Sequence, residues 1–186
     1  MIVLVPYDPR WPDAFAREAA QLAQSLGDVP LELHHMGSTA VPGILAKPVI
    51  DMLLIVPQVE ALDARGAAFA SVGYEAMGEF GIVGRRYFRK DDHTGRRTHQ
   101  VHAFSAGSLD IVRHLDFRDY VRAHSDVRDA YAALKQRLAA ECVDDMQCYS
   151  EGKTSFIRDI ERRAAIWKSA GQRDDIDHVH RPNRLT

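Results

Sequence analysis

The chain has 186 residues and a nearly balanced charge, with 24 lysine and arginine residues against 26 aspartate and glutamate residues. This length suffices for one compact domain with an appended subdomain, and the lack of a marked basic excess argues against a dedicated nucleic-acid binder. No apolar run is long enough to span a bilayer, and residues 1–6 are too short for a signal peptide, so we expect a cytoplasmic protein without membrane contact.

The first part of the sequence predicts helices and strands in alternation. Apolar residues recur at helical spacing between Pro12 and Gly27, which predicts an amphipathic helix. Residues 31–36 are predicted to form a strand and residues 49–56 a second, more deeply buried one. The alanine-rich residues 59–72 predict a helix that covers the resulting sheet.

The second part begins with a hairpin and then becomes helical. Residues 80–88 and 98–104 predict two strands, joined by the turn-rich residues 91–95. From Ser108 onward the apolar spacing is helical, and Ser125 is placed to cap one of these helices.

These elements together predict an α/β (α+β) fold, a mixed sheet flanked by helices with a helical C-terminal part. We expect one domain over residues 1–170, divided into an α/β core (1–107) and a helical part (108–170). The polar residues 171–186 have weak periodicity and are predicted to form a flexible tail.

Asp51 is the most informative residue, because it stands in an otherwise apolar strand. A carboxylate in such a strand either changes its protonation or finds a cation, so a metal ion or a basic side chain is expected nearby. The turn at Gly37 and Ser38 lies a short distance upstream, and its small side chains and accessible amides suit phosphate oxygens. The alternative is a structural role for Asp51, pairing with a buried arginine or capping a turn.

This arrangement resembles the nucleotidyltransferase superfamily, whose signature is a Gly-Ser turn followed about a dozen residues later by two acids, one residue apart, on a strand. Within it the chain is similar to the GrpB family, on residues 35–43, 47–51, 98–102, 117–120 and on Tyr149 with Lys153. The resemblance implies the fold, a nucleotide ligand and transfer of a nucleotidyl group to an unknown acceptor. It also implies a link to coenzyme A metabolism, since GrpB-like domains occur fused to dephospho-CoA kinase.

The sequence departs from the superfamily at the second acid, which is replaced by Leu53. Two divalent ions need several carboxylates, so two-metal catalysis is not expected. A single-metal site remains, built from Asp51 with His102 and His35, since family position favours His102 over His99. Such a mixture of nitrogen and oxygen ligands favours Mn, Zn or Ni over Mg. The site gains further carboxylate ligands only if an acid from elsewhere reaches Asp51, the candidates being Glu32, Glu79 and Asp110.

Several other residues are candidate phosphate contacts. Ser38 and Thr39 would act through hydroxyl and backbone N–H groups, or serve only as turn formers. Lys47 is either a counter-charge for phosphate or a solvated lysine. Tyr149 and Lys153 lie one helical turn apart, and the resemblance implies that Lys153 closes over the cleft as a catalytic or phosphate-binding residue; the alternative is an exposed lysine.

The hairpin carries many arginines, most of which we interpret as a solvated, charged sheet edge. Among them Arg86 is predicted to turn toward the cleft, because it shares a strand side with the apolar Phe88. Its planar guanidinium suits a bidentate phosphate contact.

Three other motifs carry no functional prediction. Gly43 is followed by Ile44 instead of Lys and Ser or Thr, so the turn is not a P-loop. A Ser-His-Asp triad lacks the Gly-x-Ser-x-Gly elbow. Cys142 and Cys148 fit neither a disulfide framework nor a zinc ribbon.

The sequence therefore favours a protein that binds a nucleotide or another phosphorylated small molecule, with a divalent metal (Mg or Mn, or else Zn or Ni), and that transfers a nucleotidyl group. The alternative is a scaffold or nucleotide-binding module that has lost transfer chemistry, as Leu53 suggests. A structural protein with an empty cleft is a third hypothesis. The base, the acceptor and the oligomeric state are not specified by the residues.

Overall fold

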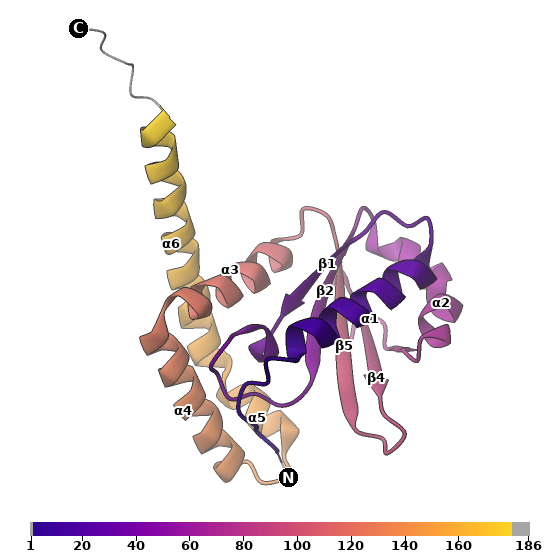
Figure 1. Ribbon diagram of the computed structural model, residues 1–186, viewed down its shortest axis with the longest axis horizontal. Helices are drawn as coiled ribbons and strands as arrows, with labels where there is room; N and C mark the ends of the chain where they lie inside the picture. The colour runs from indigo at the N-terminus through magenta and orange to yellow at the C-terminus, as the bar shows by residue number, and fades with distance from the viewer. Residues whose placement is uncertain (1, 180–186) are drawn as a thin grey trace, which may run out of the picture.

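A mixed five-stranded sheet forms the centre of the molecule, with the strand order β1-β2-β5-β4-β3 (Figure 1). The computed structural model describes residues 2–179, and the bounds of the strands are β1 Glu32–Met36, β2 Ile50–Val56, β3 Glu75–Ala76, β4 Arg85–Asp91 and β5 Arg97–Ser105. Strands β2 and β5 pair in parallel, and the other neighbours pair antiparallel. The predicted mixed sheet is confirmed.

One face of the sheet is covered by helix α1 (Trp11–Leu26), the 3₁₀ helix η2 (Val59–Arg65) and helix α2 (Gly66–Ser71). Helix α1 has a proline in its first turn and ends at Gly27, whose φ of 65° suits glycine. Leu22, Met52 and Phe69 lie fully buried in the core between these helices and the sheet. This core fixes strand β2, and with it Asp51.

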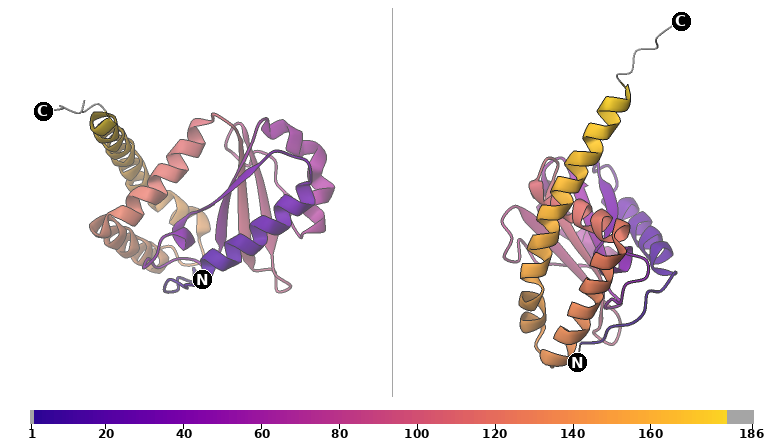
Figure 2. Two further views of the ribbon diagram at one scale, coloured as in Figure 1. Left: turned by 45° about the horizontal axis from the view of Figure 1, so that its top comes forward. Right: turned by 90° about the vertical axis from the view of Figure 1, so that its left-hand side faces the viewer.

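Four helices follow the sheet: α3 (Leu109–Ala123), α4 (Ser125–Glu141), α5 (Met146–Gly152) and α6 (Thr154–Val179). Helices α3, α4 and α6 form a second core around Val41 and Ile44, which belong to the loop between β1 and β2. Tyr149 of α5 packs in a smaller cluster with Leu138 of α4. Helix α6 is the longest and extends well away from the sheet (Figure 2). Among the helices that the structure describes, none has the length and apolar character needed to cross a membrane.

Three boundaries differ from the sequence predictions. Residues 80–84 form a loop and the strand begins at Arg85, because Gly81 and Gly84 adopt positive φ. Ser125 is the first residue of α4, and His124 holds the cap position without a side-chain bond. Helix α6 continues through Gly171 to Val179, past the start of the predicted tail at residue 171; residues 180–186 lie outside the described part. A helix already formed extends past one glycine at modest cost.

The alternation of side chains along β2 places Asp51 on the face opposite the α1 core. Met52 belongs to the core under α1, whereas Leu53 belongs to a small cluster on the other face. The partners of Asp51 in the sheet are Met36 of β1 and Gln100 of β5. Asp51 thus faces the side on which the C-terminal helices lie.

The turn after β1 lies directly against Asp51. Gly37 has a φ of 70°, and a Cβ atom added there would lie 2.9 Å from the Asp51 Cβ and in collision with its carboxylate. Only glycine satisfies both the backbone conformation and the space. The turn continues as a short 3₁₀ helix, η1 (Ser38–Ala40), whose residues Ser38 and Thr39 line the same cavity as Asp51.

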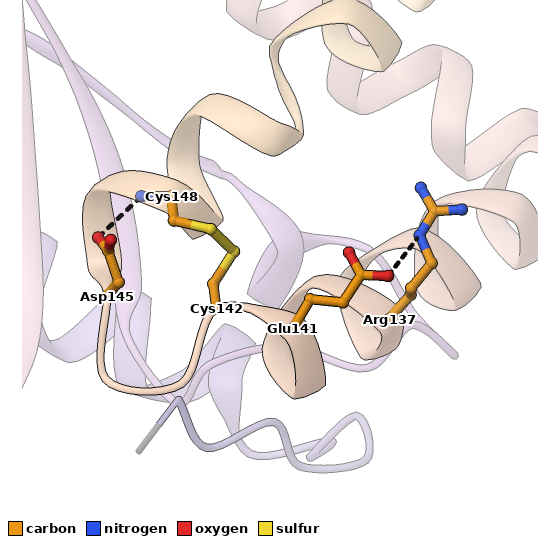
Figure 3. The surroundings of a disulfide bond; sticks show 5 residues. All are labelled: Arg137, Glu141, Cys142, Asp145 and Cys148. Atoms are coloured by element: carbon orange, nitrogen blue, oxygen red, sulfur yellow. Dashed lines mark hydrogen bonds and ion pairs between the residues drawn. A yellow bond between two sulfur atoms is a disulfide. The ribbon is translucent and has the colours of Figure 1, made fainter.

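A disulfide joins Cys142, just after α4, to Cys148 in α5 (Figure 3). Its closed loop is too short to serve as the framework of a fold, so the spacing of the two cysteines did not predict this bond. The side chain of Asp145 accepts a hydrogen bond from the Cys148 N–H at 2.9 Å and caps α5. The disulfide and this cap together fix the start of α5.

We predict that replacing Gly37 with alanine destabilises the fold and distorts the position of Asp51. The positive φ alone costs about 1–3 kcal/mol in a non-glycine residue, and the collision adds to it. The matched control is Gly95→Ala, because Gly95 also has a positive φ (79°) but open space around its Cβ position. Urea denaturation gives both free energies of unfolding, and an equal loss in the two variants contradicts the close approach to Asp51.

We predict that the disulfide contributes roughly 2 kcal/mol to stability by restricting the unfolded chain. The Cys148→Ser variant should therefore melt at a lower temperature than the oxidised wild type, with little difference once both are reduced. Thiol labelling of the native wild type should give no reaction. Two labelled thiols in protein isolated without reductant would contradict the bond.

Candidate functional site

A cavity of about 440 Å³ lies between the Asp51 face of the sheet, the turn η1 and helices α4 and α5. Asp51 and Gln100 line its floor, Ser38 and Thr39 line the turn side, and α5 contributes Tyr149. The remaining lining residues are Lys47, Val49, Phe80, Tyr87, Arg97, Tyr131, Lys135, Met146, Ser150 and Lys153. The volume lies within the range of small-molecule sites in proteins.

Basic side chains dominate the cavity. Three of the five lysines in the sequence line it, together with Arg97. Lys135 is 2% exposed, and its Nζ donates hydrogen bonds to the Leu45 carbonyl and, at 3.1 Å, to Ser38 Oγ. Arg97 is bonded to Asp91 and, at 3.2 Å, to the Tyr87 hydroxyl. The three lysines therefore line one cavity, and one of them, Lys135, is bonded to the turn.

Burial lowers the pKa values of all three lysines. It lowers the pKa of Lys135 to about 7, with a further contribution from the positive charge of Lys153. Burial likewise lowers the pKa of Lys153 to about 8, again helped by a neighbouring lysine, Lys47, and opposed by Asp51. The pKa of Lys47 is also lowered, chiefly by burial. An anion in the cavity would reverse these shifts, because it stabilises the charged form of each lysine.

Asp51 supplies the only carboxylate among the described residues that line the cavity. Burial raises its pKa to about 6, against the opposing effect of Lys47 and Lys153. The three acids considered as further ligands do not line the cavity: Glu32 pairs with His34, Glu79 accepts from Gly84, and Asp110 pairs with Arg113. The described lining residues thus offer one carboxylate, whereas two divalent ions need several.

The hydroxyl groups of the two predicted turn residues have different hydrogen-bond partners. Ser38 Oγ is bonded to Lys135 at the edge of the cavity. Thr39 is buried, and its Oγ1 is bonded to His35 Nε2 at 2.9 Å and to the Val49 carbonyl at 3.3 Å. The hydroxyl of Thr39 thus has the structural role of a turn former, whereas Ser38 is placed beside a cation.

Tyr149 and Lys153 meet as the sequence spacing predicts. The Lys153 Nζ lies 4.4 Å from the centre of the Tyr149 ring, and the Lys47 Nζ lies 5.6 Å from it. Both contacts are in the range of cation–π attraction. Tyr149 itself is buried, and burial raises its pKa to about 12. The Tyr149 side chain is therefore neutral and rigid, and its ring holds two of the lysines at the cavity.

The prediction for Arg86 is wrong. Its partner in β5 is Ala103, whose side chain lies in the α1 core, so Arg86 belongs to the face opposite Asp51. There its guanidinium forms a bidentate pair with Asp63, with one N–O distance of 2.8 Å. Both faces of this sheet are covered, so the burial of Phe88 did not identify the cleft side. Arg97 is the arginine that lines the cavity.

The predicted histidine ligands do not meet Asp51. His35 lies on the α1 side, where its ring stacks on Phe15 at 5.0 Å and burial lowers its pKa to about 4. His102 shares the Asp51 face, as the family resemblance implied, but lies outside the cavity with its Nδ1 3.2 Å from Arg85 Nη1. In residues 2–179 no group of three or more potential His, Cys, Asp or Glu ligands is placed to hold a metal ion.

Sequence reasoning missed Lys135 and Gln100. Lys135 lies four residues after Tyr131 and three before Leu138, on a helix face that is otherwise apolar. A lysine in that position indicates a buried cation, so the sequence pattern could have identified it. Gln100 could have been found from strand parity, because it shares a side with His102. The segment 117–120, quoted for the family resemblance, has a structural role here: Arg118 donates to the His35 carbonyl at 3.0 Å and ties α3 to β1.

Comparison with known proteins gives relatives along most of the chain. The UPF0157 protein YqkA of Bacillus subtilis is 40% identical over 90% of this chain, which spans 48% of that protein. A UPF0157 protein of Halalkalibacterium halodurans is 38% identical over 88% of this chain and 82% of its own. A dephospho-CoA kinase of Mycolicibacterium paratuberculosis is 30% identical over 88% of this chain and 46% of the kinase. The chain thus spans only about half the length of some of these relatives.

Solved structures support the same assignment. The crystal structure of the conserved protein GrpB from Enterococcus faecalis is 41% identical, with a TM-score of 0.81 over 87% of this chain and 96% of that one. Cid1, in complex with its short product ApU, is 11% identical with a TM-score of 0.51 over 80% of this chain and 48% of that chain, which shows a nucleotidyltransferase-like fold alone. The family model described as GrpB protein matches residues 1–163. The chain belongs to the GrpB family.

Proposed function

We propose that the protein binds a nucleotide through its phosphate groups in the cavity beside Asp51. The observation that carries this proposal is the convergence of Lys47, Lys135 and Lys153 on one small cavity that contains a single carboxylate. Ammonium groups held together at a partly buried site repel one another, and a polyanion offsets this repulsion. A phosphate chain supplies that charge and accepts the hydrogen bonds that the lysines offer.

The residues fit one divalent ion and not two. A Mg²⁺ or Mn²⁺ ion is often held by one carboxylate together with phosphate oxygens and water, and Asp51 would be that carboxylate. When bound, the ion would polarise the phosphate that it contacts. Zn²⁺ or Ni²⁺ would require the histidines, and these lie apart from Asp51.

Transfer of a nucleotidyl group is consistent with this arrangement. Lys135 and Lys153 would neutralise the outer phosphates and so stabilise the pyrophosphate that leaves. Ser38, held by Lys135, would orient the same groups at the turn. The alternative is a nucleotide-binding module without transfer chemistry. The single carboxylate supports it, since Leu53 replaces the second acid.

We predict that ATP raises the melting temperature of the wild type, by about 5–10 °C at a hundredfold excess over Kd. Lys153→Met should abolish most of the shift, because it removes an ammonium group from the cavity. Asp51→Asn should abolish only the additional shift that Mg²⁺ or Mn²⁺ produces. The measurement is a thermal melt with the four common nucleoside triphosphates, with and without each ion.

The matched control is Lys168→Met, which removes a lysine of α6 that lies outside the cavity. It should leave the ATP shift unchanged. A wild type that shows no shift with any triphosphate, or a Lys153→Met variant with the full shift, contradicts the proposal. Transfer is tested separately by pyrophosphate release from ATP with Mn²⁺ and a panel of hydroxyl-bearing acceptors; no release with any acceptor favours the binding module.

We predict that the affinity for ATP falls as the pH rises from 7 to 9.5. The pKa values of Lys135 (about 7) and Lys153 (about 8) lie below that of a free lysine, so both lose their charge in this range. The terminal phosphate, with a pKa near 6, is already ionised in this range. The loss of lysine charge therefore determines that the affinity falls as the pH rises. Each proton taken up on binding gives about a tenfold change per pH unit.

Calorimetric titration across this pH range measures the effect. In Lys135→Met the fall near pH 7 should disappear, while the fall near pH 8 remains. An affinity that stays constant from pH 7 to 9.5 in the wild type contradicts the assignment of these lysines to the phosphates.

A further inference from the structure

The cavity has a second wall that differs in chemistry from the lysine wall. Phe80 comes from the loop between β3 and β4, Tyr87 from β4, and Gln100 from β5, and all three line the cavity. This wall consists of two aromatic rings and an amide, with Arg97 bonded to the Tyr87 hydroxyl beside them, whereas the ammonium groups come from the β1–β2 loop, from α4 and from the residue after α5. Asp51, on β2, belongs to the floor between them.

Within this wall the free aromatic surface belongs to Phe80. The rings of Phe80 and Tyr87 are stacked, with centres 5.2 Å apart and an angle of 24° between their planes. Tyr87 is 6% exposed and is also contacted by the guanidinium of Arg85, 5.1 Å from its ring centre. Phe80 is 60% exposed. Tyr87 therefore packs against one side of the Phe80 ring, and the exposed surface of Phe80 lies at the entrance of the cavity.

The backbone holds Phe80 in a conformation that its side chain does not favour. Its φ is 45°, which is rare for a bulky residue, and it lies between Gly78 and Gly81, both with positive φ. Residues in such conformations persist where the surroundings impose them, and they gather at ligand-binding sites. Exposure of a large apolar ring to water is unfavourable, and a ligand that covers the Phe80 ring at the entrance of the cavity would remove this cost.

We infer that this wall binds the base of the nucleotide, which stacks on Phe80 while the lysines hold its phosphates. This inference rests on the proposed function and specifies how the ligand is recognised. A planar aromatic ring gains stacking energy on Phe80 whatever its identity, whereas a sugar phosphate or inorganic polyphosphate does not. The Gln100 amide offers a donor and an acceptor to the base edge, and makes no hydrogen bond to other side chains in the described part of the chain.

The test compares ATP with inorganic tripolyphosphate, which carries the phosphates without a base, by calorimetric titration. Wild type should bind ATP more tightly than tripolyphosphate. Phe80→Ala should weaken ATP binding at least about fivefold, as expected for the loss of one stacking contact, and leave tripolyphosphate binding unchanged. The matched control is Val83→Ala in the same loop, since Val83 is 88% exposed and does not line the cavity.

Each outcome has a separate meaning. If tripolyphosphate and ATP bind equally well and Phe80→Ala changes neither, the base site is wrong while phosphate binding stands. If Val83→Ala weakens ATP binding as much as Phe80→Ala, the effect belongs to the loop as a whole and the stacking assignment is overturned. If neither compound binds to folded wild type, the proposed function fails and the base site fails with it. Gln100→Ala, tested with ATP, GTP, CTP and UTP, should change the order of their affinities.

Discussion

The close approach of Gly37 to Asp51 is the contact on which the site depends. This contact packs the turn after β1 directly against strand β2, so that Ser38 and Asp51 line the same cavity. The loop that follows the turn carries Val41 and Ile44 into the core of the C-terminal helices. Those helices bring Lys135 and Tyr149 to the cavity. One backbone position that accepts only glycine thus links the sheet, the turn and the helical part, and the lysine wall of the cavity follows from that link.

The charge of the cavity follows from the same geometry. Strand alternation gives Asp51 no acidic neighbour on its face, because Leu53 occupies the next position of its row and packs with Met36 and Phe104. The C-terminal helices meanwhile place ammonium groups around this one carboxylate. In the proposed function the lysines carry most of the positive charge, and one ion completes the neutralisation of the phosphate chain. This balance sets the chain apart from a two-metal site, although the fold is nucleotidyltransferase-like.

Much of the fold was predictable from sequence because its signals are local. The helix ending at Gly27 and the buried strand with Asp51 depend on spacing along the chain. The errors arise where contacts are distant. Arg86 was assigned to the wrong face because both faces of the sheet are covered, which one strand cannot reveal. His35 pairs with Thr39 and Phe15 across the α1 core. Lys135 becomes part of the site only because α4 packs over a turn 97 residues earlier in the sequence.

The most direct test of the central claim is a crystal structure with a non-hydrolysable ATP analogue and Mn²⁺. Our account predicts phosphate oxygens within hydrogen-bond distance of Nζ in Lys135 and Lys153, and anomalous density from one manganese ion next to the carboxylate of Asp51. Phosphates bound elsewhere on the protein, or two manganese ions in the cavity, would contradict it.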